Sequence, residues 1–387
     1  MKYPQPIHLV AARRSPIGRF GGGLKSLTPA DLALQIAEAV VPAALKAAVG
    51  QVILGQVLQA GAGMNVARQV GLRLGLAQTA PAFTVNMACA SGLHAVALAA
   101  SAITNGEAAL VLAGGVEVMS RAPHYLTDLR WGKKLGASEL ADAMFCDGLS
   151  DPVLKIGMGD TAERIAEICK IGREAQDAFA FRSQQRAAAS RADFQREIVS
   201  VTGSDGTIAE DEHPRADTTI EKLAKLKPAF RADGSVTPGN SSGINDGAAL
   251  LLVANEEAIR AHGLQSRARI VASTVVGCDP AVMGLGPIGA VRRLCEETGW
   301  KLDGVDAIEI NEAFAVQTLA CAQELGLDAE RLNQRGGAIA LGHPIGCSGA
   351  RVLVTLLHIL EDRKLKRGIA ALCVGGGMGI AMAIERE

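Results

Sequence analysis

Aromatic residues are scarce in this chain of 387 residues, where Phe, Trp and Tyr together make up 3%. A surface that stacks nucleic-acid bases or sugar rings needs such side chains, so that class of binding surface is not expected. The formal net charge is −1, which leaves no broad field to attract nucleic acid or a membrane. We therefore expect neither nucleic acid nor membrane as a partner.

Long hydrophobic runs are also missing. The N-terminal segment Met1–Val10 lacks the apolar stretch of a secretory signal. The most apolar long segment, Leu32–Val49, is interrupted by Glu38, Pro42 and Lys46, which is typical of a helix in a water-soluble protein rather than a membrane span. These features predict a cytoplasmic protein.

Paired cysteine motifs are absent, although the chain holds eight cysteines. None are spaced as Cys-x-x-Cys, and none have zinc-ligand spacing to a histidine. A chain of this length with a full core does not need a disulfide framework, so most of the cysteines should be small buried side chains. Cys89 and Cys373 are exceptions, because both lie beside turns rich in glycine or alanine.

Short β-branched runs alternate with helical patterns along the chain, which predicts an α/β fold with a mixed sheet. In the first half we expect strands at Ile7–Ala11, Val52–Leu54, Phe83–Asn86 and Leu110–Ala113, and helices at Leu32–Val49, Ala67–Leu74 and Gly92–Thr104. In the second half we expect strands at Arg269–Ser273, Ala307–Ile310 and Ala370–Val374, and a helix at Gly349–Leu360. The order strand, helix, strand, glycine run occurs in both halves, which indicates a duplicated αβ unit.

A different stretch separates the two halves. It is richer in charge and turn residues and carries one long helical pattern, Asp160–Arg191. We interpret residues 121–243 as an inserted loop domain that supplies ligand-binding and oligomer contacts. Residues 1–120 then form the first half, completed by about 244–265, and residues 266–387 form the second.

Cys89 is the first candidate for chemistry, in the segment Asn86–Gly92, where a strand ends and a helix begins. The free N–H groups and the dipole of a helix N-terminus favour a thiolate. That effect is worth about one pKa unit, which leaves the thiol only partly ionised at neutral pH, so a nearby base is needed. The alternative is a structural cysteine in a packed turn.

Three further segments supply candidate partners for that thiol. His343 lies in a glycine-rich loop ahead of a helix and could act as a base. Cys373 ends a strand that opens into Gly375–Gly377, where backbone N–H groups could bind an anion. Asn311 follows a strand, either as a helix cap or as a site residue. A dinucleotide-binding loop is disfavoured, since the Gly-x-Gly-x-x-Gly spacing is not met.

Together these segments resemble the thiolase family over essentially the whole chain. The likeness begins at Arg14–Gly22 and ends with the Cys-x-Gly-Gly-Gly signature at Cys373–Gly377, while Leu129–Gly132 and Lys227–Phe230 fit its short-chain acetyl-CoA acetyltransferase members. The resemblance implies a thiolase-like fold of duplicated αβαβα layered halves. It also implies an acyl-CoA C-acyltransferase that interconverts two acetyl-CoA, or acyl-CoA plus acetyl-CoA, with 3-ketoacyl-CoA plus CoA.

The same resemblance implies roles for individual residues. Cys89 would be acylated, His343 would activate it, and Cys373 would move the α-proton of the substrate. Asn311 would hold a water in one oxyanion hole, and the backbone N–H groups of Cys89 and Gly375 would form the other. The implied substrate-binding residues are Ser242 at the pantetheine arm, Arg215 near the nucleotide, and a tunnel lining of Leu149, Met158, Ala229, Phe230, Met283, Ala313 and Phe314. No cofactor is expected, because coenzyme A is a substrate, and the loop Tyr125–Met144 predicts a homotetramer.

One position departs from the pattern of the short-chain members. Many of them have His-Met-Gly where this chain has Gly157-Met158-Gly159, so a thiolase of broader chain length is one alternative. A synthase on the same fold is a second alternative, although Cys373 speaks against it. A CoA- or lipid-binding protein without activity is a third, and the three intact reactive residues disfavour it.

Overall fold

The computed structural model describes residues 1–387, and its centre is one mixed sheet of ten strands. The strands follow the order β14-β15-β16-β13-β1-β12-β5-β3-β4, with β2 paired to β12. Their bounds are β1 Lys2–Arg14, β2 Gly18–Arg19, β3 Gln51–Gly55, β4 Ala82–Val85, β5 Leu110–Val118, β12 Asn245–Asn255, β13 Ala268–Gly277, β14 Ala307–Ile310, β15 Arg367–Val374 and β16 Met378–Glu385.

The sheet repeats its pairing pattern about its middle, where β1 and β13 are antiparallel neighbours. In the first half β3 and β5 are parallel, and β12 then runs antiparallel to both β5 and β1. In the second half β14 and β15 are parallel, and β16 runs antiparallel to both β15 and β13. The duplicated α/β fold expected from the sequence is confirmed.

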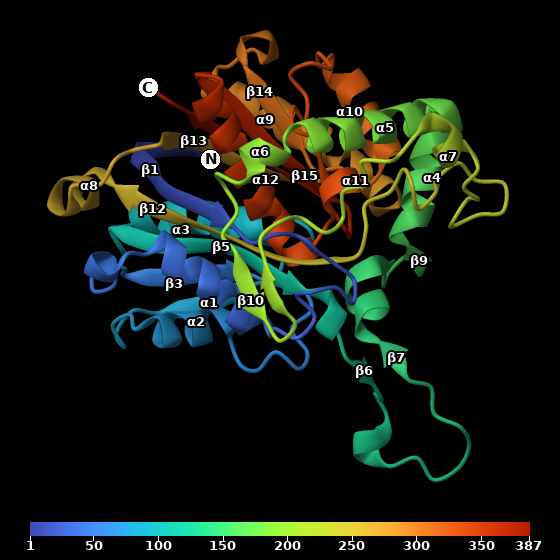
Figure 1. Ribbon diagram of the computed structural model, residues 1–387, viewed down its shortest axis with the longest axis horizontal. Coiled ribbons are helices and arrows are strands. Elements are labelled where there is room, and N and C mark those ends of the chain that lie inside the picture. Colours follow the sequence, from blue (N-terminus) through green and yellow to red (C-terminus); the bar gives the residue numbers. More distant parts are fainter.

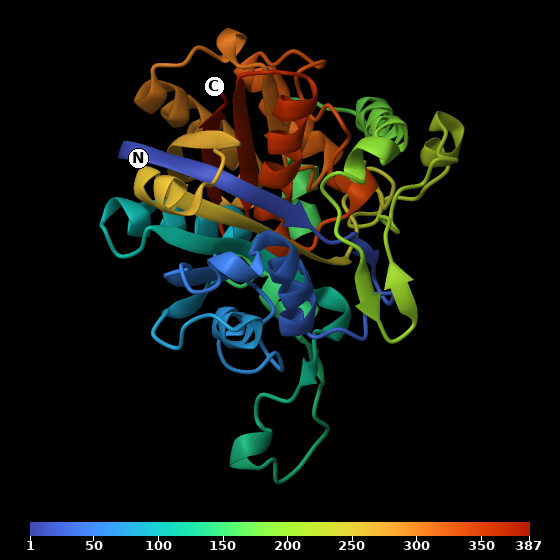
Figure 2. The same cartoon turned by 60° about the vertical axis from the view of Figure 1, so that its left-hand side comes forward.

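Helices lie between the two halves of the sheet and on both of its outer sides (Figures 1 and 2). The central pair is α3 (Ser91–Thr104) and α12 (Ile345–Asp362), whose apolar residues join strands of both halves in a core of 36 buried residues. On one outer side α1 (Pro29–Val40) and α2 (Val66–Leu74) cover the first half. On the other, α9 (Gly286–Thr298) and α10 (Ala315–Leu325) cover the second.

Local sequence explains where α1 begins and ends. Thr28 accepts a hydrogen bond from the backbone of Asp31, whose carboxylate bonds back to Thr28, and Pro29 stands in the first turn. The expected continuation of this helix to Val49 is wrong. The helix stops at Val40, because Pro42 cannot donate to the helical ladder, and only the short turn Ala43–Leu45 follows.

Between the halves the chain forms several short elements. They are α4 (Met158–Cys169), α5 (Arg173–Ala189), α6 (Arg191–Phe194), β10 (Val201–Gly203), β11 (Gly206–Ile208) and α7 (Ile220–Ala224). The single helix expected over Asp160–Arg191 is therefore wrong. Lys170 adopts a left-handed conformation with φ 54° and caps α4, so α5 begins three residues later.

An arm leaves the body of the molecule at the short strands β6 (His124–Tyr125) and β7 (Ala141–Asp142), as Figures 1 and 2 both show. A second small hairpin, β8 (Ser150–Asp151) and β9 (Ile156–Gly157), follows it. The remaining helices are α8 (Glu256–His262) and α11 (Ala338–Leu341). None of the helices combines the length and the apolar character that a membrane crossing requires.

Candidate active site

Cys89 stands at a sharp turn between β4 and α3. The residue before it, Ala88, has a φ of 44°, in the left-handed region that non-glycine residues rarely adopt. Ser91 holds this turn closed, because its hydroxyl donates to the Ala88 carbonyl at 2.7 Å and accepts the Met87 N–H at 2.9 Å. The result is a strained, well-held turn that leaves Cys89 only partly buried, two residues ahead of the helix.

The helices α3 and α12 touch backbone to backbone at their N-terminal ends. A Cβ atom on Gly92 would lie 2.9 Å from the Ala350 nitrogen and 3.0 Å from the Gly346 carbonyl oxygen. A Cβ atom on Gly349 would lie 2.5 Å from the Leu93 nitrogen. Glycine is required at these positions, and the close approach brings the segment that carries Cys89 beside the segment that precedes α12.

His343 lies in that preceding segment and is buried. Its Nδ1 atom is 2.5 Å from the Ser348 hydroxyl and 3.5 Å from the Asn311 side-chain nitrogen, and its backbone N–H donates to Asn245 at 3.0 Å. Its Nε2 atom has no partner. Burial lowers the pKa of His343 to about 3, so the ring is a neutral base with one nitrogen free to accept a proton.

Cys373 ends β15 and is completely buried. Burial, followed by the charge of a Cys89 thiolate, raises the pKa of Cys373 well above the ordinary thiol value. Although part of the residue stays accessible, Cys89 lies deep enough in the protein for desolvation to raise its pKa to about 11, against the opposing effect of the Gly375 and Cys89 backbone N–H groups. A Cβ atom on Gly375 would lie 3.9 Å from the Ala88 side chain, so the segment after Cys373 adjoins the turn that carries Cys89, and the two thiols share a site. Desolvation outweighs the effect of the helix N-terminus expected for Cys89.

The expected tunnel residues are largely brought together. Met283, Ala313 and Phe314 pack in one cluster with Cys373, and Met158 packs against it. The ring of Phe230 meets Phe314 edge to face, with 6.1 Å between centroids.

The remaining substrate-binding candidates lie around this cluster. Ser242 donates its backbone N–H to the Ala313 carbonyl at 2.9 Å. Leu149 packs against the same small cluster as Cys89, and Ala229 is exposed beside Phe230.

Arg215 is the expected site residue with the weakest link to this arrangement. Its backbone N–H donates to the Gln184 side chain, but the residue itself is exposed. Gly157 precedes α4, where its N–H donates to Asp160 at 3.0 Å. A Cβ atom there would meet only the Asp160 carboxylate at 3.3 Å and the Leu149 carbonyl at 4.0 Å, so the position has open space in front of it.

Residues that sequence reasoning missed hold these segments together. Glu117, Asn245 and Ser348 are buried, and each bonds to His343 itself or to the backbone near it. For Glu117 a signal existed, since a carboxylate inside an apolar strand needs partners. The structure brings no group of three His, Cys, Asp or Glu side chains into metal-binding geometry.

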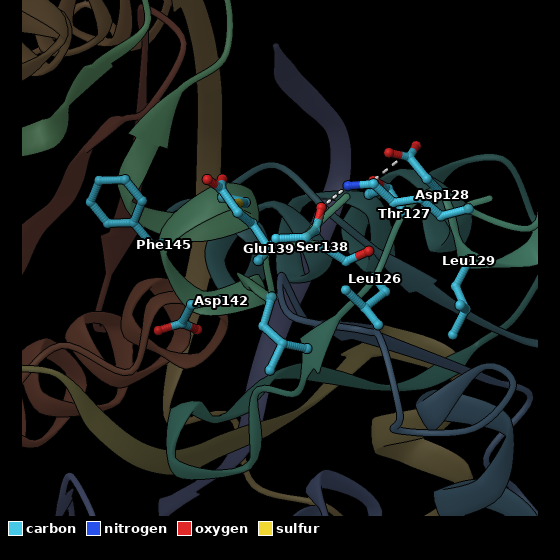
Figure 3. A pocket seen from close by; sticks show the side chains of 13 residues that line it. Leu126, Thr127, Asp128, Leu129, Ser138, Glu139, Asp142 and Phe145 are labelled. Carbon is cyan, nitrogen blue, oxygen red and sulfur yellow. Dashed lines mark hydrogen bonds between the residues drawn. The ribbon is translucent and has the colours of Figure 1, made fainter. Parts of the chain in front are cut away.

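A large, open cavity of about 780 Å³ lies elsewhere, within the arm itself (Figure 3). Its labelled side chains include Leu126, Leu129, Asp142 and Phe145, and none of the reactive residues above contributes to it. The cavity is therefore separate from the candidate active site.

Comparison with known proteins finds relatives over almost the whole chain. Models of the thiolase N-terminal domain and the thiolase C-terminal domain match residues 7–257 and 264–386. An acetyl-CoA acetyltransferase of Chromobacterium violaceum is 48% identical, over 98% of this chain and 99% of that protein. A cytosolic acetyl-CoA acetyltransferase of Mus musculus is 46% identical, over 98% of both chains. The crystal structure of human mitochondrial 3-ketoacyl-CoA thiolase in complex with CoA superposes with a TM-score of 0.97 at 41% identity, covering 100% of this chain and 99% of that one.

Proposed function

The chain belongs to the thiolase family and is an acyltransferase, and we propose that Cys89, His343 and Cys373 carry out its reaction on coenzyme A thioesters. The observation that carries this proposal is the shared site of the two thiols, with a neutral imidazole in the adjoining segment. A neutral thiol beside a neutral imidazole is the resting form of a base-activated nucleophile.

In the thiolytic direction, the Cys89 proton passes to Nε2 of His343 as the sulfur attacks the keto carbon of a 3-ketoacyl-CoA. The C–C bond then breaks, and its electron pair leaves on the α-carbon of acetyl-CoA. Cys373 gives its proton to that carbon. The high pKa of Cys373 supports this role, because a thiol that stays protonated can serve as an acid.

The second half-reaction releases the acyl group. An incoming CoA thiol passes its proton to the Cys373 thiolate and attacks the acyl carbon on Cys89. The Cys89 sulfur leaves and recovers the proton held by His343. Both sets of steps run in reverse for condensation of two acetyl-CoA, and the proton and acyl transfers balance without a metal or redox cofactor.

Two carbonyl oxygens gain charge along this path, and each needs preorganised donors. The backbone N–H groups of Cys89 and Gly375 suit the oxygen of the acyl group on Cys89. Asn311, within reach of His343, suits a water that faces the second thioester oxygen. Each well-placed donor is worth roughly 3–4 kcal/mol of transition-state stabilisation.

The proposal is tested by CoA-dependent cleavage of acetoacetyl-CoA, followed as loss of the 3-ketoacyl-CoA absorbance, and by CoA release from acetyl-CoA, followed with a thiol reagent. An acetyl-CoA acetyltransferase turns over both substrates. A binding protein on the same fold turns over neither, which would overturn the proposal.

A broader acyl-chain range is a second candidate, favoured by Gly157. The open space in front of this residue supports acceptance of chains longer than acetoacetyl. Rates of thiolysis across 3-ketoacyl-CoAs of increasing length decide between the two, and an abrupt loss beyond four carbons would exclude the broader range.

We also propose a homotetramer in the cytoplasm that serves lipid metabolism. The arm carries apolar side chains that are mostly exposed, which is typical of a protein–protein interface. They are Leu129, Trp131, Leu135 and Leu140. A second copy of the chain is the proposed partner for this arm. The mouse relative, which is a cytosolic enzyme by name, supports the cytoplasm as the location.

A further inference from the structure

Glu117 is a buried carboxylate that the proposed reaction does not use. It lies near the end of β5 and is fully buried, and its hydrogen-bond partners are three backbone N–H groups rather than a cationic side chain. Burial raises its pKa to about 7, against the opposing effect of three backbone N–H groups. An ionisable group of this kind is costly to bury, so its contacts call for a functional explanation.

Those contacts join two segments that flank Cys89. The carboxylate accepts from Val57 at 2.9 Å and Leu58 at 3.2 Å on one side, and from Gly346 at 3.0 Å on the other. The side chains of Val57 and Leu58 pack in the cluster that Cys89 adjoins. Gly346 follows His343 by three residues, in the first turn of α12.

The bond to Gly346 also caps a helix that cannot cap itself. Pro344 precedes α12 and offers no side-chain hydrogen bond to its free N–H groups. The Glu117 carboxylate meets that need from another element, with its negative charge at the positive end of the helix. A Cβ atom on Gly346 would lie 2.7 Å from this carboxylate, so the contact requires glycine.

We propose that Glu117 is a positioning residue that fixes the loop carrying His343 against Val57 and Leu58, beside Cys89. Its charge also opposes early loss of the Cys89 proton. The proposal rests on the acyl-transfer function assigned above. Burial is the main reason that Cys89 keeps its proton, and the ionised Glu117 carboxylate adds to that effect and opposes the helix dipole, so the proton leaves when His343 takes it during attack. Three titratable groups face the carboxylate: Asp246 on β12, Cys89 before α3 and Cys347 on α12.

Two variants separate the reach of this side chain from its charge. Glu117→Gln keeps the length and removes the charge, whereas Glu117→Asp keeps the charge and loses the reach. Both should lower kcat for thiolysis by roughly 10- to 100-fold, with a smaller effect on KM. The reason is that Asp cannot reach all three N–H groups and Gln replaces one accepting oxygen with an NH2 donor, so the His343 loop shifts in each variant. Only Glu117→Gln should lower the pH midpoint for alkylation of Cys89 by iodoacetamide, by roughly one pH unit.

The midpoint is read by mass spectrometry on the peptide that contains Cys89, so it does not depend on turnover. A site that is merely loosened would show the same fall in both variants, and that result would overturn the role of the charge. Wild-type kcat in both variants would overturn the positioning role. If Glu117→Gln does not fold, Glu117→Asp decides alone: kcat at the wild-type level contradicts the proposal. If the wild-type protein itself lacks thiolysis, the proposed function fails while the alkylation midpoints still test Glu117.

Discussion

Burial keeps both Cys89 and His343 neutral in the resting protein, which decides how the thiol must be activated. With a thiol pKa of about 11 and an imidazole pKa of about 3, a preformed ion pair is strongly disfavoured. Proton transfer must accompany nucleophilic attack, when charge moves on to the substrate oxygen. The Ser348 hydroxyl at Nδ1 leaves Nε2 as the nitrogen that accepts the proton.

Gly157 provides a test of chain-length selection at a single residue. A side chain fits there once the Asp160 carboxylate, which would lie 3.3 Å from the Cβ atom, shifts slightly, since no backbone atom would lie closer than 4.0 Å. Gly157→His should therefore fold normally, retain thiolysis of acetoacetyl-CoA within a few-fold, and reduce thiolysis of longer or branched 3-ketoacyl-CoAs by roughly 10-fold or more. Gly157→Ala is the control, and its thiolysis rates on the longer chains should lie between those of the wild-type protein and of Gly157→His. Equal loss on all chain lengths would show that the position does not face the acyl chain.

At the scale of elements, the contact between α3 and α12 is the critical one. Gly92→Ala would force a methyl group against the backbone of α12 at 2.9 Å, so we expect a lower melting temperature and a loss of kcat of at least 10-fold as Cys89 and His343 move apart. Gly289→Ala on α9 is the matched control, because its Cβ would meet only a Val276 methyl at 3.3 Å. That variant should keep its activity and gain up to about 1 kcal/mol of helix stability. Similar behaviour of the two variants would contradict the account.

The elements also show what the sequence could predict. Most buried strands carry a strong apolar signal, and so do α3 and α12, which follow motifs of small residues; the sequence predicts these elements. It does not predict the central strands β12 and β16, and β1 and β5 extend five residues beyond their expected ends. The sequence does not predict the break between α4 and α5, because the break depends on a left-handed Lys170 rather than on a glycine at that position.

For the site, the sequence motifs predict Cys89, His343 and Cys373 as candidates. They could not give Glu117 or Asn245, whose roles depend on backbone groups that long-range folding brings to them.

For the whole molecule, the arm tests the proposed assembly. Replacing residues 126–140 by an Asn-Gly turn would close β6 onto β7 and remove the exposed apolar side chains of the arm. Light scattering should then report a dimer where the wild-type protein is a tetramer, while acylation of Cys89 persists. A wild-type protein that is already a dimer at micromolar concentration, or a variant that stays tetrameric, would contradict the role of the arm.

Buried histidines make the stability of the whole molecule depend on pH. Burial, aided by Arg267, lowers the pKa of His358 to about 4, whereas an unfolded histidine titrates near 6.5. The stabilisation of the folded state that neutral His358 provides is therefore complete above pH 6.5. It is lost as the pH falls toward 4, because the histidine of the unfolded chain takes up a proton at a higher pH than the buried one. The gap in unfolding free energy between wild type and His358→Gln should narrow by roughly 2 kcal/mol between pH 7 and 4.5. Denaturant titrations at both pH values measure it, and a constant gap would rule out a neutral buried His358.

The most direct test of the central claim is the acetyl adduct on Cys89 in a Cys373→Ala protein. Acylation of Cys89 by acetyl-CoA moves no α-proton, so this variant should still show an acetyl mass shift on the peptide that contains Cys89. Its thiolysis and condensation should fall by roughly 10²- to 10⁴-fold, the range for one acid–base group, while Cys89→Ala should show neither adduct nor turnover. A folded Cys373→Ala protein with near wild-type turnover, or an adduct that persists in Cys89→Ala, would contradict the assignment of these two thiols.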